Sequence, residues 1–176
     1  MRKKFIVTAF GKDRPGIVAD ISEMLYENGC NLEDTRMTIL ADTFASLLLI
    51  SAPEKEDIEQ QFSNGCRRLE IEKGISAYVR PVSDQKAEHE KSFSTRTLKV
   101  EGLDQTGIVF KVSKYLADNQ INIEDLSSTI RSAPESGSDI YSMDIKIQVP
   151  EGTSMDVLST GLDKIADDLD VEIMFI

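Results

Sequence analysis

Gly11-Lys-Asp-Arg-Pro-Gly-Ile-Val18 reads as a turn that opens into a helix, and the chain carries a second copy of it from Gly102. Segments 11–34 and 102–125 align without a gap at an offset of 91 residues, with 11 identities in 24 positions. Identity at this level over a fixed offset indicates an internal duplication. The 176 residues therefore predict two modules of roughly 80–90 residues each, a size at which a domain buries only a modest core.

The helix after the first turn has recognisable start and stop signals. We expect Asp13 to cap its N-terminus and Pro15 to lie in its first turn, where a missing N–H is not needed. Apolar side chains recur at helical spacing from Ile17 to Leu25, and Asn28-Gly29 favours a left-handed end.

The rest of the first module shows strand patterns and one further helix. Pro53 is expected to open that helix, Gly65 to weaken it and Lys73-Gly74 to end it. The second module repeats the order, with a longer loop at residues 132–139 where the first has a tight turn. Strands of the first module are expected at residues 5–10, 31–40, 44–50 and 75–82, with the tight turn at 41–42.

This order predicts an α+β chain of two ferredoxin-like βαββαβ domains in tandem. Each domain would have an antiparallel four-stranded sheet with two helices on one face. The first predicted domain comprises residues 1–83 and the second residues 95–176. Residues 84–94 are polar and charged, which predicts a linker between them.

Charge and cysteine content narrow the classes of function. The chain has 20 Lys and Arg against 31 Asp and Glu, a net charge of −11 with His neutral, which disfavours direct binding to nucleic acid or to an anionic membrane. Cys30 and Cys66 form no CxxC pair and are expected to be small core residues in a reducing compartment. Because no apolar run suggests a signal peptide or a membrane span, we expect a cytoplasmic protein.

No set of residues predicts catalysis, a metal or a cofactor. The sole histidine, His89, lies in the predicted linker, and the chain has no phosphate-binding loop and no nucleophile motif. Glu33-Asp34 and Glu124-Asp125 recur in both modules, but adjacent strand residues point to opposite faces and do not form an acid–base pair. We therefore expect a protein that is not an enzyme.

The repeated turn is better suited to binding. A helix N-terminus presents unpaired N–H groups that suit a carboxylate, and Gly11 and Gly16 would let a ligand approach the backbone closely. Asp13 could receive an ammonium group, and the Asn31 amide can donate and accept hydrogen bonds. An amino acid carries both charges. A purely structural interpretation stays open, with Asp13 as a cap, Gly16 as a helix–sheet contact and Asn31 as a turn residue.

These residues resemble a known family. The βαββαβ order, the DRPGIV turn and the Cys30–Asp34 and Ile121–Asp125 segments are similar to the ACT domain, an amino-acid-sensing module. Within that family, Thr8–Val18 and Gly29–Arg36 resemble the tandem-ACT glycine cleavage system transcriptional repressor group, whose members have no separate catalytic or DNA-binding domain.

The resemblance implies a ligand site between paired domains, at the first turn and the start of the second strand. Gln105-Thr106 replaces Arg-Pro in the second module, so its turn is expected to be less rigid and chiefly architectural. The implied ligand-binding residues are Gly11, Asp13, Arg14, Pro15, Gly16, Ile17 and Asn31 in the first module, and Gly102, Asp104, Gln105, Thr106, Gly107, Ile108 and Asn122 in the second.

The resulting hypothesis is a regulatory protein that binds a small amino acid such as glycine or serine. It would form homo-oligomers and control transcription of amino-acid metabolism through a protein partner. Two alternatives remain: a ligand-responsive regulatory subunit of a metabolic enzyme, and a structural dimerisation module with vestigial sites. The sequence leaves open whether the modules pair within one chain or between chains.

Overall fold

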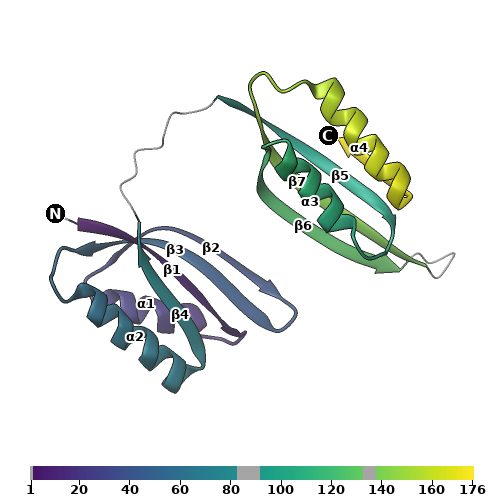
Figure 1. Cartoon of the computed structure of the whole chain (residues 1–176). Coiled ribbons are helices and arrows are strands. Elements are labelled where there is room, and N and C mark those ends of the chain that lie inside the picture. Colours follow the sequence, from purple (N-terminus) through teal and green to yellow (C-terminus); the bar gives the residue numbers. More distant parts are fainter. Residues whose placement is uncertain (1, 83–91, 133–137) are drawn as a thin grey trace. The chain divides into compact units, whose positions relative to one another are not determined.

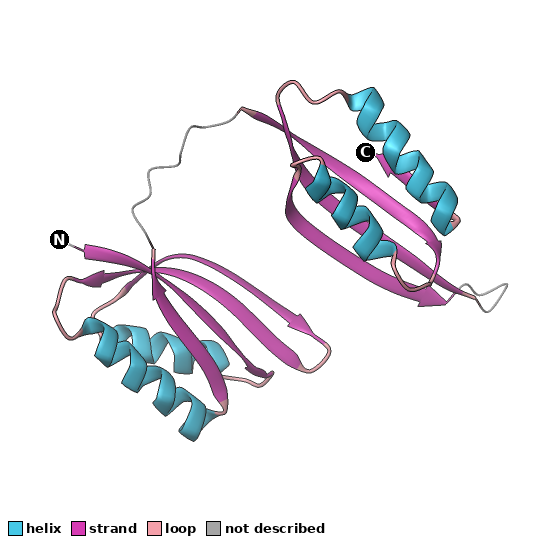
Figure 2. Ribbon diagram, viewed as in Figure 1, coloured by secondary structure: helices cyan, strands magenta, loops and turns pink. Residues whose placement is uncertain are grey.

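The computed structural model of the chain describes residues 2–82, 92–132 and 138–176 (Figure 1). The chain divides into two compact units, Met1–Lys86 and Ala87–Ile176. Each unit combines a four-stranded antiparallel sheet with two helices that cover one of its faces (Figure 2). The predicted α+β class is therefore confirmed. Most of the predicted linker, including His89, lies outside the described residues, and the first strand of unit 2 begins at Phe93.

Unit 1 has the predicted βαββαβ order. Its sheet order is β2-β3-β1-β4, so β1 and β3 are central and β2 and β4 are the edges. Both central strands pair antiparallel with their neighbours. The elements are β1 (Arg2–Lys12), α1 (Ile17–Glu27), β2 (Asn31–Leu40), β3 (Thr43–Pro53), α2 (Ile58–Lys73) and β4 (Ile75–Pro81).

Unit 2 repeats this arrangement with the sheet order β6-β7-β5-β8. Residues 133–137 of its predicted longer loop lie outside the described residues. The elements are β5 (Phe93–Leu103), α3 (Ile108–Asp118), β6 (Asn122–Ser132), β7 (Asp139–Pro150), α4 (Met155–Leu169) and β8 (Val171–Phe175).

Each unit has its own apolar core between the sheet and its two helices. In β1 the buried positions Phe5, Val7 and Ala9 alternate with more exposed ones, because successive strand residues point to opposite faces. The ring of Phe5 meets Phe62 of α2 edge-on, with centroids 5.1 Å apart. Cys30 and Cys66 are half-buried against this core, and burial raises the pKa of both thiols.

A glycine in the second helix of each unit lets the two helices pack closely. A Cβ at Gly65 would lie 2.7 Å from the Met24 side chain, and a Cβ at Gly161 would lie 1.9 Å from the Tyr115 hydroxyl oxygen. Helix α2 runs unbroken through Gly65, although its glycine was expected to weaken it. The close helix contact explains why glycine is placed there.

The predicted start of α1 is wrong, because the helix begins about one helical turn later in the sequence. The helix begins at Ile17, with Gly16 at the N-cap in a left-handed conformation, φ 89°. Asp13 therefore lies outside the helix and does not cap it. Its backbone N–H instead donates to the Asp42 carbonyl at 2.8 Å, which ties the β1–α1 turn to the β2–β3 turn.

The predicted start of α2 is also wrong. Pro53 is the last residue of β3, where it stands opposite Arg2 of β1, and the helix begins only at Ile58. The pairing of β3 with β1 thus extends through a residue that sequence patterns favour for a helix start, whereas the pairing of β3 with β2 stops at Ser51. The ends of both unit 1 helices agree with expectation, because Gly29 and Gly74 adopt positive φ.

Candidate ligand site at the two motif turns

The β1–α1 turn of unit 1 presents the open end of a helix. The N–H groups of the first helical turn have no partner earlier in the helix, and the Ile17 N–H makes only a long hydrogen bond, 3.4 Å, to the Arg14 carbonyl in the turn. The helix end is therefore rich in donors and electropositive. Gly16 provides the positive φ that starts the helix, and a Cβ at this position would meet only the Arg14 side chain, at 3.8 Å. The space beside the turn is therefore open to a small molecule.

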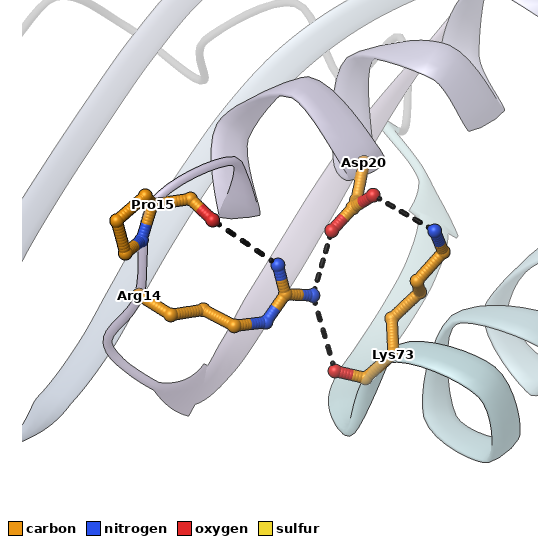
Figure 3. Close-up of polar contacts among 4 residues, drawn as sticks. All are labelled: Arg14, Pro15, Asp20 and Lys73. Atoms are coloured by element: carbon orange, nitrogen blue, oxygen red, sulfur yellow. Dashed lines mark hydrogen bonds and ion pairs between the residues drawn. The ribbon is translucent and has the colours of Figure 1, made fainter.

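The Arg14 side chain holds this turn in place through contacts with other residues of unit 1 (Figure 3). Its Nη2 donates to Asp20 Oδ2 at 2.6 Å and to the Lys73 carbonyl at 3.2 Å, and its Nη1 donates to the Pro15 carbonyl at 3.3 Å. Lys73 Nζ also lies 3.2 Å from Asp20 Oδ1. Hydrogen bonds from Arg14 and then from Lys73 hold the pKa of Asp20 below its usual value. Arg14 thus joins the turn to α1 and to the C-terminal end of α2.

The corresponding turn of unit 2 is anchored at the same place by different groups. Gln105 Nε2 donates to the Leu169 carbonyl at the end of α4, and the Asp104 N–H donates to the Asp139 carbonyl at 2.9 Å. Lys111 of α3 forms an ion pair with Asp168 of α4. Gln105 therefore fixes this turn as Arg14 fixes the other, and the expectation of a less rigid second turn has no support in these contacts. Gly107 repeats the left-handed N-cap, with φ 103°.

Close packing within each unit explains why glycine occupies positions 11 and 102, without reference to a ligand. A Cβ at Gly11 would lie 2.9 Å from the Gly74 carbonyl oxygen, and one at Gly102 would lie 2.6 Å from a methyl group of Val171. Each glycine thus lets the strand approach the start of β4 or β8. Of the other two motif glycines, Gly107 borders open space and Gly16 would meet only the Arg14 side chain, at 3.8 Å.

Asn31 lies at the opposite end of the unit 1 sheet from the motif turn. It stands opposite Ser51 of β3, and Ser51 stands opposite Lys4 near the start of β1. Gly11 is seven residues further along β1, roughly 23 Å at a rise of ~3.3 Å per residue. One ligand cannot contact Asp13 and Asn31 of the same unit.

The same separation holds in unit 2. Asn122 stands opposite Gln148, which stands opposite Thr95, whereas Asp104 follows the other end of β5. The Asn122 side chain donates to Gln148 Oε1 at 3.2 Å. Sequence reasoning placed the turn and the asparagine in one site because it lacked the strand register.

A β-bulge recurs beside each asparagine and was not predicted. The register of β2 against β3 shifts between Leu32 and Asp34, and that of β6 against β7 shifts between Ile123 and Asp125. Strict alternation therefore fails at Glu33 and at Glu124. Glu33 pairs with Lys4 at 2.7 Å, which holds the pKa of this carboxyl below its usual value, and Glu124 pairs with Lys146 at 2.9 Å. Both glutamates are engaged in ion pairs.

The described residues also bear on metal binding, on further hollows and on membrane insertion. None of their His, Cys, Asp and Glu side chains gather in groups of three that could hold a metal ion. A hollow of about 330 Å³ between α2 and β4 is lined by Phe62, Tyr78 and their neighbours, and by none of the predicted site residues. No helix in the described part of the chain has the length and apolar character needed to cross a membrane.

Comparison with known proteins identifies the family. A family model of the ACT domain matches residues 3–74. A UPF0237 protein of Methanopyrus kandleri is 34% identical over 84 residues, which are 48% of this chain and 93% of that protein. This chain belongs to the ACT domain family. The predicted recognition is confirmed, and both units have the ACT arrangement of two helices on one face of a four-stranded sheet.

Two further comparisons concern glycine cleavage repressors. The glycine cleavage system transcriptional repressor of Escherichia coli is 44% identical over 46 residues, which are 26% of this chain and 24% of that protein. A solved structure provisionally described as such a repressor matches 100% of this chain and 97% of its own, with a TM-score of 0.70 and 23% identity. The first relates an ACT segment of this chain to the repressor by sequence, and the second shows a shared tandem fold.

Proposed function

We propose that this tandem ACT protein is a non-enzymatic regulator that binds a small amino acid, such as glycine or serine. The observation that carries the proposal is the repeated motif turn, where Gly16 and Gly107 start a helix and a Cβ would meet no backbone, only the Arg14 side chain at Gly16. Such a terminus favours a carboxylate through its N–H groups and its dipole. The anchoring contacts of Arg14 and Gln105 hold each turn in place before a ligand arrives, which lowers the entropic cost of binding.

The proposed ligand lies between two paired ACT domains. The amides at Gly16 and Ile17 receive its carboxylate and Asp13 its ammonium group, because Asp13 is released from helix capping and stands beside the turn. Asn31 is too distant to act within its own domain. An asparagine from a neighbouring ACT domain, packed alongside in the opposite direction, supplies the amide contact. The equivalent residues of unit 2 are Asp104, Gly107, Ile108 and Asn122.

The proposed output is control of transcription in amino-acid metabolism through a protein partner in the cytoplasm. Sequence kinship with the Escherichia coli repressor supports this direction. Ligand binding would favour one packing of the domains and change the surface offered to the partner. The net charge of −11 favours a partner protein over nucleic acid.

Calorimetric titration of the full chain with each of the twenty amino acids tests the proposal. We expect heat of binding from glycine or serine, and at least a tenfold weaker affinity in Asp13→Ala, since the charged hydrogen bond is lost. Asp104→Ala is the matched variant in unit 2. Thermal unfolding of each variant checks that the fold is retained. If the folded protein gives no heat of binding with any of the twenty amino acids, the sensor proposal is wrong.

A further inference from the structure

The two units differ in chemistry on the sheet face that their helices leave uncovered. In β1 and β5 the buried positions face the helices, so the positions between them face the other way. Strand registers match the open-face positions of the two units pair by pair. The pairs are Ile6 with Thr97, Thr8 with Lys99, Phe10 with Glu101, Ala45 with Ser142, Leu47 with Asp144, Leu49 with Lys146 and Tyr78 with Met174.

The open face of unit 1 is therefore apolar where that of unit 2 is charged. Leu47 is 51% exposed, Phe10 43% and Tyr78 66%. The Phe10 and Tyr78 rings stack with centroids 6.3 Å apart, which joins β1 to β4 in one apolar surface. In unit 2 the same surface holds a Lys99–Glu101 ion pair. An apolar patch this contiguous on one repeat alone is typical of an interaction surface.

The shape of this face suits a second copy of itself. A hollow of about 310 Å³ lies over β1, β3 and β2, lined by Thr8, Arg36, Thr38, Ala45 and Leu47 together with the chain at Met37 and Ser46. Its lining combines the small side chains Thr8 and Ala45 with the larger Leu47. In a two-fold pair, the Leu47 side chain of one copy can enter the hollow of the other.

Charge also favours a second copy at this face. Unit 1 has twelve Lys and Arg against fourteen Asp and Glu, whereas unit 2 has eight against seventeen, so repulsion between copies is weakest at unit 1. No Asp or Glu occupies the open-face positions of β1, β3 or β4, and the acidic residue on this face, Asp34, stands opposite Leu49 on the edge strand β2. Arg36 and Arg80 lie on the outer strands, where their charges stay in solvent at the rim of a pair.

We propose that the open face of unit 1 is a dimer interface, with the unit 1 sheets of two copies packed face to face. Four strands at ~4.8 Å and seven residues at ~3.3 Å give a flat footprint of roughly 19 by 23 Å. That footprint is roughly 440 Å², about half of the ~800 Å² per partner that a standard interface buries, so the pair belongs to the small, weak interfaces. The dimer is accordingly reversible and depends on concentration. This interface stands on the open face alone and needs no amino acid.

Sedimentation equilibrium of the full chain, over about a hundredfold range of concentration, tests the interface. We expect the mass to rise from 19.6 kDa toward twice that value. Because the interface is apolar and the chain is acidic, added salt should strengthen the dimer by screening repulsion. A chain that stays monomeric throughout, or a dimer that salt dissociates, would overturn the proposal.

The sharpest variants exchange residues between the repeats. Leu47→Asp and Phe10→Glu introduce the side-chain types that unit 2 carries at the same places, where the fold accepts them. Each is expected to weaken the dimer at least tenfold with thermal unfolding little changed. Ile71→Asp, at a 72% exposed position on α2, is the matched control and should dimerise like the wild type. Dimerisation of Leu47→Asp at the wild-type concentration would contradict the interface.

These results are separable from amino-acid binding. The same variants can be titrated with glycine and serine by calorimetry. A dimer without any ligand heat would remove the sensor proposal and keep the interface. Ligand heat from a strictly monomeric wild-type chain would remove the interface, and the apolar face would then have to serve a different protein.

Discussion

The two repeats make the same helix contact with opposite charges. In unit 1, Asp20 of α1 pairs with Lys73 at the end of α2, and in unit 2, Lys111 of α3 pairs with Asp168 at the end of α4. Arg14 and Gln105, 91 residues apart, both donate to the last carbonyl of the second helix. The two turns thus make the same contact with the second helix, but different side chains make it.

The open sheet faces show the reverse behaviour. Their backbone registers match strand for strand, yet apolar residues in unit 1 correspond to charged ones in unit 2. The motif turn is therefore under the same geometric requirement in both repeats, and the open face is not. The repeats therefore share the geometry of the motif turn and differ in the chemistry of the open face.

The largest expected effect comes from the helix-packing glycines. Gly161→Ala places a Cβ 1.9 Å from the Tyr115 hydroxyl oxygen and 2.3 Å from its ring, so the ring must move. We expect a loss of about 1–2 kcal/mol in the free energy of unfolding, after the gain in helix propensity is subtracted. Chemical denaturation of the full chain, followed by circular dichroism, measures this loss.

Gly65→Ala is the matched change in unit 1. It meets the flexible Met24 side chain at 2.7 Å, so its cost should be clearly smaller. Tyr115→Met, which copies the residue of unit 1, should restore part of the stability lost in Gly161→Ala. Equal losses from the two alanines would refute the view that Tyr115 makes unit 2 the tighter helix pair.

A charge reversal between repeats should have the next largest effect. Asp20→Lys puts a cation beside Arg14 and Lys73, so the unfolding temperature should fall. Adding Lys73→Asp recreates the polarity of the Lys111–Asp168 pair and should recover part of the loss. Differential scanning calorimetry of the single and double variants measures the coupling. Additive effects would mean that the pair does not stabilise the unit.

Acid should destabilise the chain partly through Asp20 and Glu33. The folded-state pKa of each is lowered, for Asp20 chiefly by Arg14 and for Glu33 chiefly by Lys4. A lowered pKa adds stability that is present above the unfolded pKa and is lost as the pH falls through the folded one. Thermal melts from pH 7 downward should therefore show a smaller acid-induced decrease in Asp20→Asn than in the wild type. An unchanged decrease would exclude Asp20 as a contributor.

The cysteines should give the smallest effect. Burial raises the pKa of both Cys30 and Cys66, so little thiolate forms near neutral pH. We expect both to react slowly with a thiol reagent in the folded chain, and quickly after denaturation. Fast reaction of the folded Cys30→Ser variant would show that Cys66 is more accessible than its packing implies.

Hydrophobic period was enough to predict the order of elements, because the helices and the central strands each have one buried face, although β2 is exposed along its whole length. The start of α1 was missed since Asp13 suits a cap chemically, whereas the positive φ of Gly16 decides where the helix begins. Likewise Pro53 suits a helix start but is held by pairing opposite Arg2. Local signals of this kind compete with strand pairing, which a single sequence does not display.

The candidate site was predicted in its residues but not in its layout. Placing Asn31 required the register Asn31–Ser51–Lys4, and the role of Arg14 required its contact with Lys73, 59 residues away. Contacts between distant segments depend on the assembled fold. The contrast between the open faces likewise appears only after the strands of the two repeats are aligned through their pairing.

Titration of the isotope-labelled full chain with glycine or serine, followed by the NMR signals of its amides, tests the account most directly. It predicts shifts at the N–H groups of Gly16 and Ile17, together with the side-chain amide of Asn31, although the two lie at opposite ends of one sheet. Shifts in both places at the same ligand concentration would agree with a ligand shared between paired domains. An unperturbed turn at saturating amino acid would contradict it.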